Sequence, residues 1–150
     1  MSAALHLARP DDLERLKPLV AAFHAHAGIE QSDTDRTAAL KPLLEGSPHG
    51  AIYLIGPRRG PVGYIIVCFG YSVEMGGIDG FINEFYIRKA VRGRGMGAEV
   101  LRTLLPLLAE YGVRAIRLEV DDNNTSAKTL YARLGFKARK NCHLMTRKLV

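Results

Sequence analysis

A glycine-rich segment with two arginines, Arg92-Gly93-Arg94-Gly95-Met96-Gly97, has the residue types that most clearly predict chemistry. Glycine lets the backbone approach a ligand closely and turn its N–H groups toward an anion. A helix beginning at the end of the segment adds free N–H groups and the positive end of its dipole, and arginines add charge-assisted hydrogen bonds. Three spaced glycines with arginines exceed what a solvated turn requires, so the segment predicts a phosphate-binding loop.

The same loop also satisfies a dinucleotide-binding pattern, which is a second class of function. Gly93 to Ala98 reads G-x-G-x-x-A, and the acidic Glu119 follows roughly 20 residues later. A true fingerprint, however, places its first glycine at the end of a strand, whereas the charged run Arg88 to Arg92 intervenes here. The chain also offers a single βαβ unit of that kind. A nicotinamide or flavin binder therefore stays open only as an alternative.

A second segment, Asn124 to Phe136, reads NTSAKTLYARLGF and predicts a capped helix that stops at Gly135 and leads into a strand. Together with the glycine loop, this segment resembles the GNAT superfamily of acyl-CoA N-acyltransferases. The loop pattern of that superfamily, R/Q-x-x-G-x-G/A, is matched by Arg92, Gly95 and Gly97. Its later pattern, N-x-x-A-x-x-L-Y-x-x-x-G-F, is matched at every fixed position.

The resemblance implies an α/β fold with a central mixed β-sheet, helices on both faces, and two neighbouring strands that splay apart. These strands would be 81–88 and 113–120, and the pantetheine arm of acetyl-CoA would lie between them, with CoA as the product. The residues implied to contact the cofactor are Phe85, Tyr86, Ile87, Arg92, Gly93, Arg94, Gly95, Met96, Gly97, Ala98, Asn124, Ala127 and Tyr131. A homodimer is also expected from the family, although no residue pattern requires one.

Acetylation of an amine needs a base for the ammonium, a donor for the developing oxyanion and an acid for the departing thiolate. The resemblance assigns the acid to Tyr131, because a phenol with its ordinary pKa of about 10 carries its proton at neutral pH. An aromatic anchor for the helix is the alternative role of this side chain. The oxyanion donor is expected to be a backbone N–H near Phe85 or Tyr86.

The base is the least determined part of the predicted site. Many relatives carry an acid at the position of Asn83, but here the dipeptide is Asn83-Glu84. Strand alternation points Glu84 to the opposite face from Asn83, unless a β-bulge resets the register. Glu84 is the candidate base, with a surface or salt-bridged carboxylate as the alternative reading and a water chain as the alternative base. The missing acid at Asn83 also leaves open an acyl-CoA sensor without turnover.

Acidic residues in two segments suit a primary amine such as a polyamine, an amino sugar or a protein lysine. Glu30 follows the first helix, and Glu74 and Asp79 lie in a segment expected to be a loop; Asn83 completes the predicted acceptor site. Solvated carboxylates are the alternative reading of these acids.

The elements that must position these residues follow from periodicity and turn signals. The second helix is expected to be capped by Asp33 and the first by Asp11 or Asp12. Strands are predicted at 5–8, 51–55, 62–69, 81–88, 113–120 and after 136, helices at 11–27, 33–44, 95–111 and 124–134, and a loop at 70–80.

Composition bounds the remaining possibilities. The 150 residues fit one domain, 1–150, with 47% hydrophobic residues. The net charge of +6 gathers partly at the glycine loop, which suits a compact polyanion better than nucleic acid. No apolar run reaches membrane length, and the start of the chain has no secretory pattern. With two isolated cysteines, these features lead us to expect a cytoplasmic protein. His24 and His26 are two apart on a helix and do not share a face, so no metal is predicted.

Overall fold

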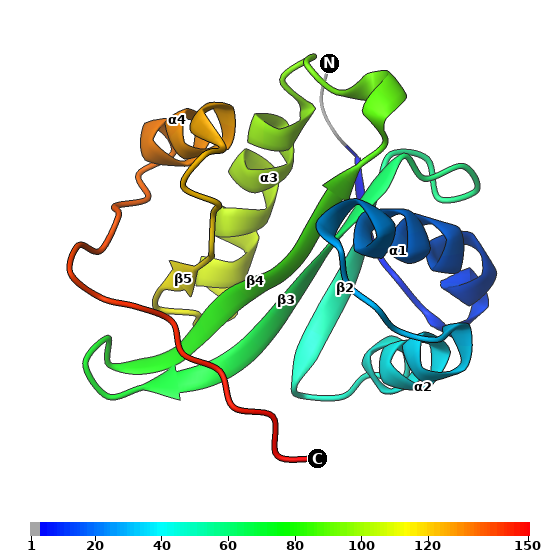
Figure 1. The fold of residues 1–150 in the computed structure, drawn as a ribbon, viewed down its shortest axis with the longest axis horizontal. Helices are drawn as coiled ribbons and strands as arrows, with labels where there is room; N and C mark the ends of the chain where they lie inside the picture. Colours follow the sequence, from blue (N-terminus) through cyan, green and yellow to red (C-terminus); the bar gives the residue numbers. More distant parts are fainter. Residues whose placement is uncertain (1–3) are drawn as a thin grey trace. The chain divides into compact units, whose positions relative to one another are not determined.

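The computed structural model describes residues 4–150, which form two compact units, one ending at Glu119 and the other spanning Val120–Val150 (Figure 1). The first unit contains β1 (Leu5–Leu7), α1 (Leu13–Ala27), α2 (Asp33–Leu44), β2 (Gly50–Ile55), β3 (Gly63–Ser72), β4 (Gly77–Ile87), α3 (Met96–Glu110) and β5 (Ile116–Arg117), with 3-10 turns at Pro10–Asp12 and Lys89–Val91. The second unit contains α4 (Thr125–Arg133).

The five strands form one sheet in the order β1-β2-β3-β4-β5. The first three pairings are antiparallel, whereas β4 and β5 are parallel, so the predicted mixed sheet is confirmed. The pairing of β4 with β5 is restricted to Gly80 with Ile116 and Phe81 with Arg117. From residue 82 onward, β4 has no strand partner on this edge within residues 4–150. The two strands therefore part where the resemblance implied a splay.

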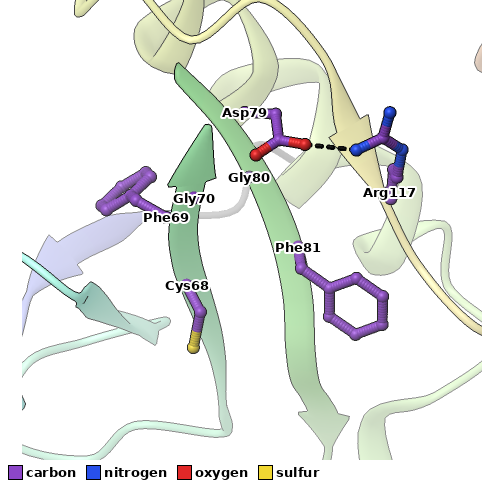
Figure 2. A pocket seen from close by; sticks show the side chains of 7 residues that line it. All are labelled: Cys68, Phe69, Gly70, Asp79, Gly80, Phe81 and Arg117. Carbon is purple, nitrogen blue, oxygen red and sulfur yellow. Dashed lines mark hydrogen bonds and ion pairs between the residues drawn. The ribbon is translucent and has the colours of Figure 1, made fainter. Parts of the chain in front are cut away.

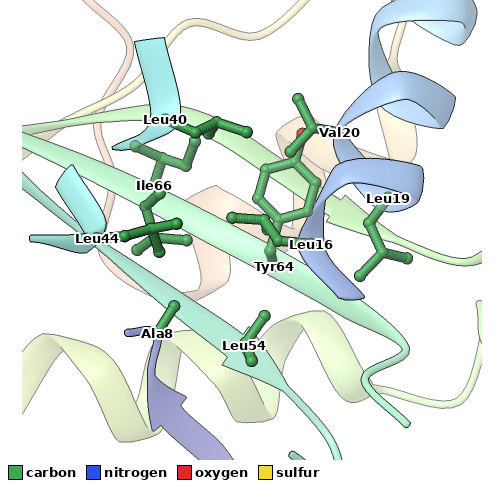
Figure 3. Close-up of a cluster of buried hydrophobic side chains, with 10 residues drawn as sticks. Ala8, Leu16, Leu19, Val20, Leu40, Leu44, Leu54, Tyr64 and Ile66 are labelled. Atoms are coloured by element: carbon green, nitrogen blue, oxygen red, sulfur yellow. The ribbon is translucent and has the colours of Figure 1, made fainter. Parts of the chain in front are cut away.

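Helices cover both faces of this sheet (Figure 1). Tyr64 and Ile66 of β3 pack with α1 and α2 on one face, whereas the alternate residues Ile65 and Val67 are buried on the opposite face, which α3 covers. The first cluster, shown in Figure 3, comprises Ala8, Leu16, Leu19, Val20, Leu40, Leu44, Ile52, Leu54, Tyr64 and Ile66. Because β3 is buried on both faces, it rigidly supports β4, which carries the candidate site.

The predicted helix caps need correction. Ser32, not Asp33, caps α2, and its Oγ accepts the backbone N–H of Asp35 at 3.0 Å. Asp12 occupies the N-cap position of α1 but makes no side-chain cap bond. Its buried carboxylate instead accepts hydrogen bonds from Arg15 of the same helix, at 2.9 Å, and from Arg58, at 2.6 Å. The bond from Arg58 ties the helix to the β2–β3 turn.

Three predicted segments also differ in the structure. The stretch 70–80 is not a loop, because β3 continues to Ser72 and pairs with β4 from Gly77 onward. Within this hairpin, a Cβ added at Gly80 would lie 2.5 Å from Ile116 Cδ1 of β5, so the Ile116 side chain would have to turn away. The strand expected at 113–120 shortens to β5. Residues 136–150 form no strand, since no described segment pairs with them.

Candidate active site

A β-bulge in β4 determines the direction of the candidate base. Ile66 pairs with Glu84 while Val67 pairs with Ile82, so Asn83 is an extra residue without a partner. In a regular strand the neighbouring side chains of Asn83 and Glu84 would point to opposite faces. The bulge resets this alternation, so both residues line the same pocket. This pocket, of about 280 Å³, is lined by Val20, His24, Gln31, Arg36, Ala39, Leu40, Leu43, Ile66, Asn83 and Glu84.

The Glu84 carboxylate is held by a donor on each oxygen. Tyr64 donates its hydroxyl hydrogen to Oε1 at 2.7 Å, and His24 Nε2 lies 2.8 Å from Oε2. The side chain of Glu84 is 15% exposed, so it reaches the pocket while most of it is buried. A carboxylate has about four lone-pair directions, and two remain for an incoming ammonium or a water molecule. This arrangement can accept a proton.

Sequence reasoning did not identify Tyr64 or His24 as part of this site. A signal for His24 exists, since it lies one turn after Val20 and two turns after Leu16 on the buried stripe of α1. A polar side chain in an apolar row needs a partner, which here is Glu84. Tyr64 lies within a wholly apolar strand run and is fully buried, so only the fold reveals its hydroxyl partner.

Burial, followed by the neighbouring Glu84 charge, raises the pKa of the Tyr64 hydroxyl. We expect Tyr64→Phe to lower the free energy of unfolding by about 1–3 kcal/mol, because it leaves a partly buried carboxylate oxygen without its donor. Because the pKa is raised in the folded state, the protonated hydroxyl contributes its full stability at any pH below the unfolded tyrosine value of about 10. This contribution is lost as the pH rises beyond that value. The difference between the proteins should therefore be largest at neutral pH and shrink in alkali.

Urea denaturation of both proteins at neutral and alkaline pH measures this difference. Tyr71→Phe, at a position that is 73% exposed, is the matched control and should be neutral. Equal stability of Tyr64→Phe and the parent protein at neutral pH would contradict the expectation.

The free edge of β4 presents main-chain groups of the residues predicted to hold the pantetheine arm. Arg88 donates its N–H to Val62 O at 2.7 Å, on the β3 side. In an antiparallel ladder this direction alternates, so Tyr86 also turns its main chain toward β3, whereas Phe85 turns its N–H and C=O toward the edge that β5 leaves open. Of the two predicted oxyanion donors, only Phe85 therefore has its main chain directed at the open edge.

Arg92 connects the end of this strand to the glycine loop. Its Nε donates to Ile87 O at 2.6 Å, and its guanidinium lies 5.4 Å from the centre of the Tyr86 ring. The Ile87 carbonyl is thus occupied, and Arg92 orders the loop in addition to supplying charge.

The glycine loop has the backbone that a pyrophosphate requires. Gly93 and Gly95 have φ values of 80° and 74°, the left-handed region, and a Cβ added at either would meet nothing within 4 Å. Gly95 is the N-cap of α3, and the first N–H of this helix to reach a carbonyl is that of Glu99, 3.2 Å from Gly95 O. The preceding N–H groups have no backbone acceptor in the described chain. These open donors, with Arg92 and Arg94 beside them, fit a polyphosphate.

The remaining predicted cofactor residues lie in the second unit, on α4. Asn124 caps this helix, and its Oδ1 accepts the N–H of Ala127 at 3.2 Å. Tyr131 packs edge-to-face on Phe136 with ring centres 5.6 Å apart, and burial raises the pKa of its hydroxyl. The tyrosine therefore keeps its proton, as a general acid must, and it also serves as an aromatic anchor.

The three acidic residues predicted to bind the acceptor do not come together. Asp79 lies in β4, where it forms an ion pair with Arg117 of β5 and lines a separate pocket of about 190 Å³ (Figure 2). Glu74 is exposed in the turn between β3 and β4, on the order of 20 Å along the strand from Glu84. Glu30 is exposed next to Gln31, which lines the Glu84 pocket. Asp79 thus ties two strands together, and Asn83 and Glu30 are the predicted acceptor residues at or beside the Glu84 pocket.

Among residues 4–150, no three side chains of His, Cys, Asp or Glu gather as they would around a metal ion. No helix in the same range has the length and apolar composition needed to cross a membrane.

Comparison with known proteins agrees with this geometry. The sequence model of the family described as Acetyltransferase (GNAT) family matches residues 13–136, and the chain belongs to this family. Family membership and a sheet with one parallel pair remove the basis for the dinucleotide alternative.

Individual relatives extend the comparison. An integron cassette protein from the mobile metagenome of Cole Harbour Salt Marsh superposes with a TM-score of 0.83 at 32% identity, over 97% of this chain and 90% of that one. Bovine thialysine N-epsilon-acetyltransferase is 32% identical over 82 residues, which are 53% of this chain and 48% of the relative. Spermine/spermidine N(1)-acetyltransferase of Bacillus subtilis is 36% identical over 58 residues, 38% of each chain. The match thus spans about half or less of these curated relatives.

Proposed function

We propose that this chain is a single N-acetyltransferase domain that moves the acetyl group of acetyl-CoA to a primary amine in a ternary complex. The observation that carries the proposal is the bulge at Asn83. It turns Glu84 into a pocket on one face of β4, next to the open main-chain edge at Phe85. The family match runs from 13 to 136 and so crosses the boundary between the two units at Glu119, which supports a single domain.

Each demand of the reaction has a residue to meet it. Acetyl-CoA supplies an activated thioester carbonyl. Glu84 accepts a proton from the acceptor ammonium, and the Phe85 N–H donates to the oxygen that gains negative charge. The loop from Arg92 to Ala98 holds the pyrophosphate. Tyr131 gives its proton to the departing thiolate, a role that rests on the family resemblance.

The pocket also favours a particular class of acceptor. Five of its ten lining residues are apolar, namely Val20, Ala39, Leu40, Leu43 and Ile66. At about 280 Å³ it lies at the lower end of ligand pockets. Glu84 attracts one ammonium, whereas the Arg36 guanidinium in the same lining disfavours a second positive charge nearby. We therefore propose a compact primary amine with an apolar body, preferred over polyamines, amino sugars and protein lysines.

The decisive experiment measures binding and turnover together. Acetyl-CoA and CoA at about 100 times their Kd should each add roughly 2.7 kcal/mol of stability in a thermal-shift titration, whereas NADH should add none. Arg92→Ala should weaken both shifts. CoA release should then be followed with an aliphatic monoamine, spermidine, an amino sugar and a lysine peptide, of which the monoamine should give the highest kcat/KM.

Each result has a definite meaning. No shift with either CoA species would contradict the proposed cofactor. Binding without turnover of any amine would favour the acyl-CoA sensor over the enzyme. A preference for spermidine over the monoamine would contradict the proposed acceptor class alone.

A further inference from the structure

We propose that His24 and Arg36 are positioning residues for the base. Arg36 selects one tautomer of His24, and His24 in that tautomer aims the Glu84 carboxylate into the pocket. This inference rests on the proposed function of Glu84, and it extends the site from β4 to both N-terminal helices. We call the series Arg36–His24–Glu84 the relay. Neither His24 nor Arg36 needs to touch the acceptor or the reacting atoms for the relay to act.

The tautomer follows from hydrogen-bond chemistry. Arg36 Nε lies 3.2 Å from His24 Nδ1. A guanidinium has donors and no acceptor, so the imidazole nitrogen facing it must be the one with a free lone pair. A neutral imidazole with its lone pair on Nδ1 carries its hydrogen on Nε2. That nitrogen lies 2.8 Å from Glu84 Oε2, so His24 donates to the carboxylate.

Arg36 is itself held in place. Its NH2 group donates to Gln31 O at 3.0 Å, and its NH1 group lies 3.8 Å from Asp33 Oδ1. The side chains of Arg36 and His24 are 11% and 6% exposed. A nearly continuous buried chain therefore runs from α2 through α1 to the base. The distances decrease from 3.2 Å at the arginine to 2.8 Å at the carboxylate.

The same geometry excludes His24 as the base in this arrangement. Its Nδ1 lone pair is occupied by Arg36, and its Nε2 already carries a hydrogen. Among Arg36, His24 and Glu84, Glu84 alone has acceptor capacity left for an ammonium proton. His24 thus acts through Glu84, fixing Oε2 while Tyr64 fixes Oε1.

Catalytic groups lose much of their effect when their orientation is not held, and a displacement of about 1 Å can cost on the order of 100-fold in rate. We expect His24→Leu to lower kcat by about 10- to 100-fold through this loss of orientation. The acetyl-CoA Kd should stay unchanged, because the main-chain edge and the glycine loop are intact. His24→Gln should recover most of kcat, since its amide N–H can replace Nε2 as the donor. His26→Gln, at an exposed position of the same helix, should match the parent protein.

A second measurement does not depend on turnover. Nitrogen-15 NMR of the imidazole at mildly alkaline pH should show hydrogen on Nε2 and none on Nδ1 of His24 in the parent protein. Arg36→Met, which keeps length and removes the donor, should produce a mixture of tautomers.

The two measurements separate the relay from the proposed function. A hydrogen on Nδ1 in the parent protein, or equal losses of kcat in His24→Leu and His24→Gln, would overturn the relay. Full activity of a Glu84→Gln variant would instead overturn the role of the base, whatever the tautomer of His24. If His24→Leu fails to fold, the NMR result and His24→Gln still decide the proposal.

Discussion

Glu84→Gln is expected to lower kcat by about 10²- to 10⁴-fold, the range that a positioned general acid or base contributes. Glutamine keeps the size of the side chain, and its amide oxygen can still accept from one donor. Its amide nitrogen cannot take a proton and would face a second donor, either Tyr64 or His24. The measurement is kcat with both substrates saturating, so that weaker binding does not enter the comparison.

Two controls accompany the Glu84→Gln variant, namely acetyl-CoA binding and the Glu30→Gln variant. Binding of acetyl-CoA should be unchanged, because Glu84 faces the helices α1 and α2 while the Phe85 main chain faces the open edge. Glu30→Gln removes an exposed carboxylate beside the pocket and should change kcat little. If Glu84→Gln retained the parent kcat, the proton would have to leave through water, and the bulge would have no catalytic meaning.

The sequence was sufficient where the signals are local. The glycine loop and α4 are recognised from residues within about a dozen positions of one another, because φ requirements, capping and helix stops act over one or two turns. The mixed sheet and the two faces of helices follow from element order together with the family resemblance.

The orientation of Glu84 could not be predicted, because it depends on how β4 pairs with β3 across the hairpin. A bulge adds one residue to one strand and reverses the side-chain direction beyond it. The residue type at Asn83 does not indicate that a bulge forms there. His24 is 60 positions from Glu84 in the chain, and Arg117 is 38 from Asp79. Such pairs form through the tertiary fold, so sequence periodicity shows at most that a buried polar residue needs a partner.

The misassigned loop at 70–80 has a related cause. Glycine usually weakens a strand, so several glycines near one another indicate a loop. Here one of them, Gly80, leaves room for the Ile116 side chain of β5, and the hairpin remains paired around it. A glycine in a strand can thus mark a position where a neighbouring group leaves little room for a side chain. The same explanation applies to Gly63.

Gly63→Ala is expected to destabilise the protein by about 3 kcal/mol or more and to disturb cofactor binding in the fraction that folds. A Cβ at this position would lie 2.1 Å from the Tyr86 carbonyl oxygen and 3.0 Å from Ile87 Cα. Both atoms belong to the backbone, so no side-chain rotation relieves the contact. β3 would have to move away from the end of β4. In this part of β4 the Ile87 carbonyl accepts a hydrogen bond from Arg92, and the Phe85 main chain faces the open edge.

Gly60→Ala is the matched control, since a Cβ there meets nothing within 4 Å and the residue has no positive φ. It should be neutral or slightly stabilising, because alanine restricts the unfolded chain more than glycine does. Urea denaturation gives both stabilities, and thermal shifts with acetyl-CoA compare the binding of the folded proteins. Equal stability and equal acetyl-CoA shifts in the two variants would mean that β3 can move without cost, and that the close approach of the two strands does not set the position of the open edge. A loss confined to Gly63→Ala would show that the spacing of β3 and β4 is a condition for both folding and cofactor binding.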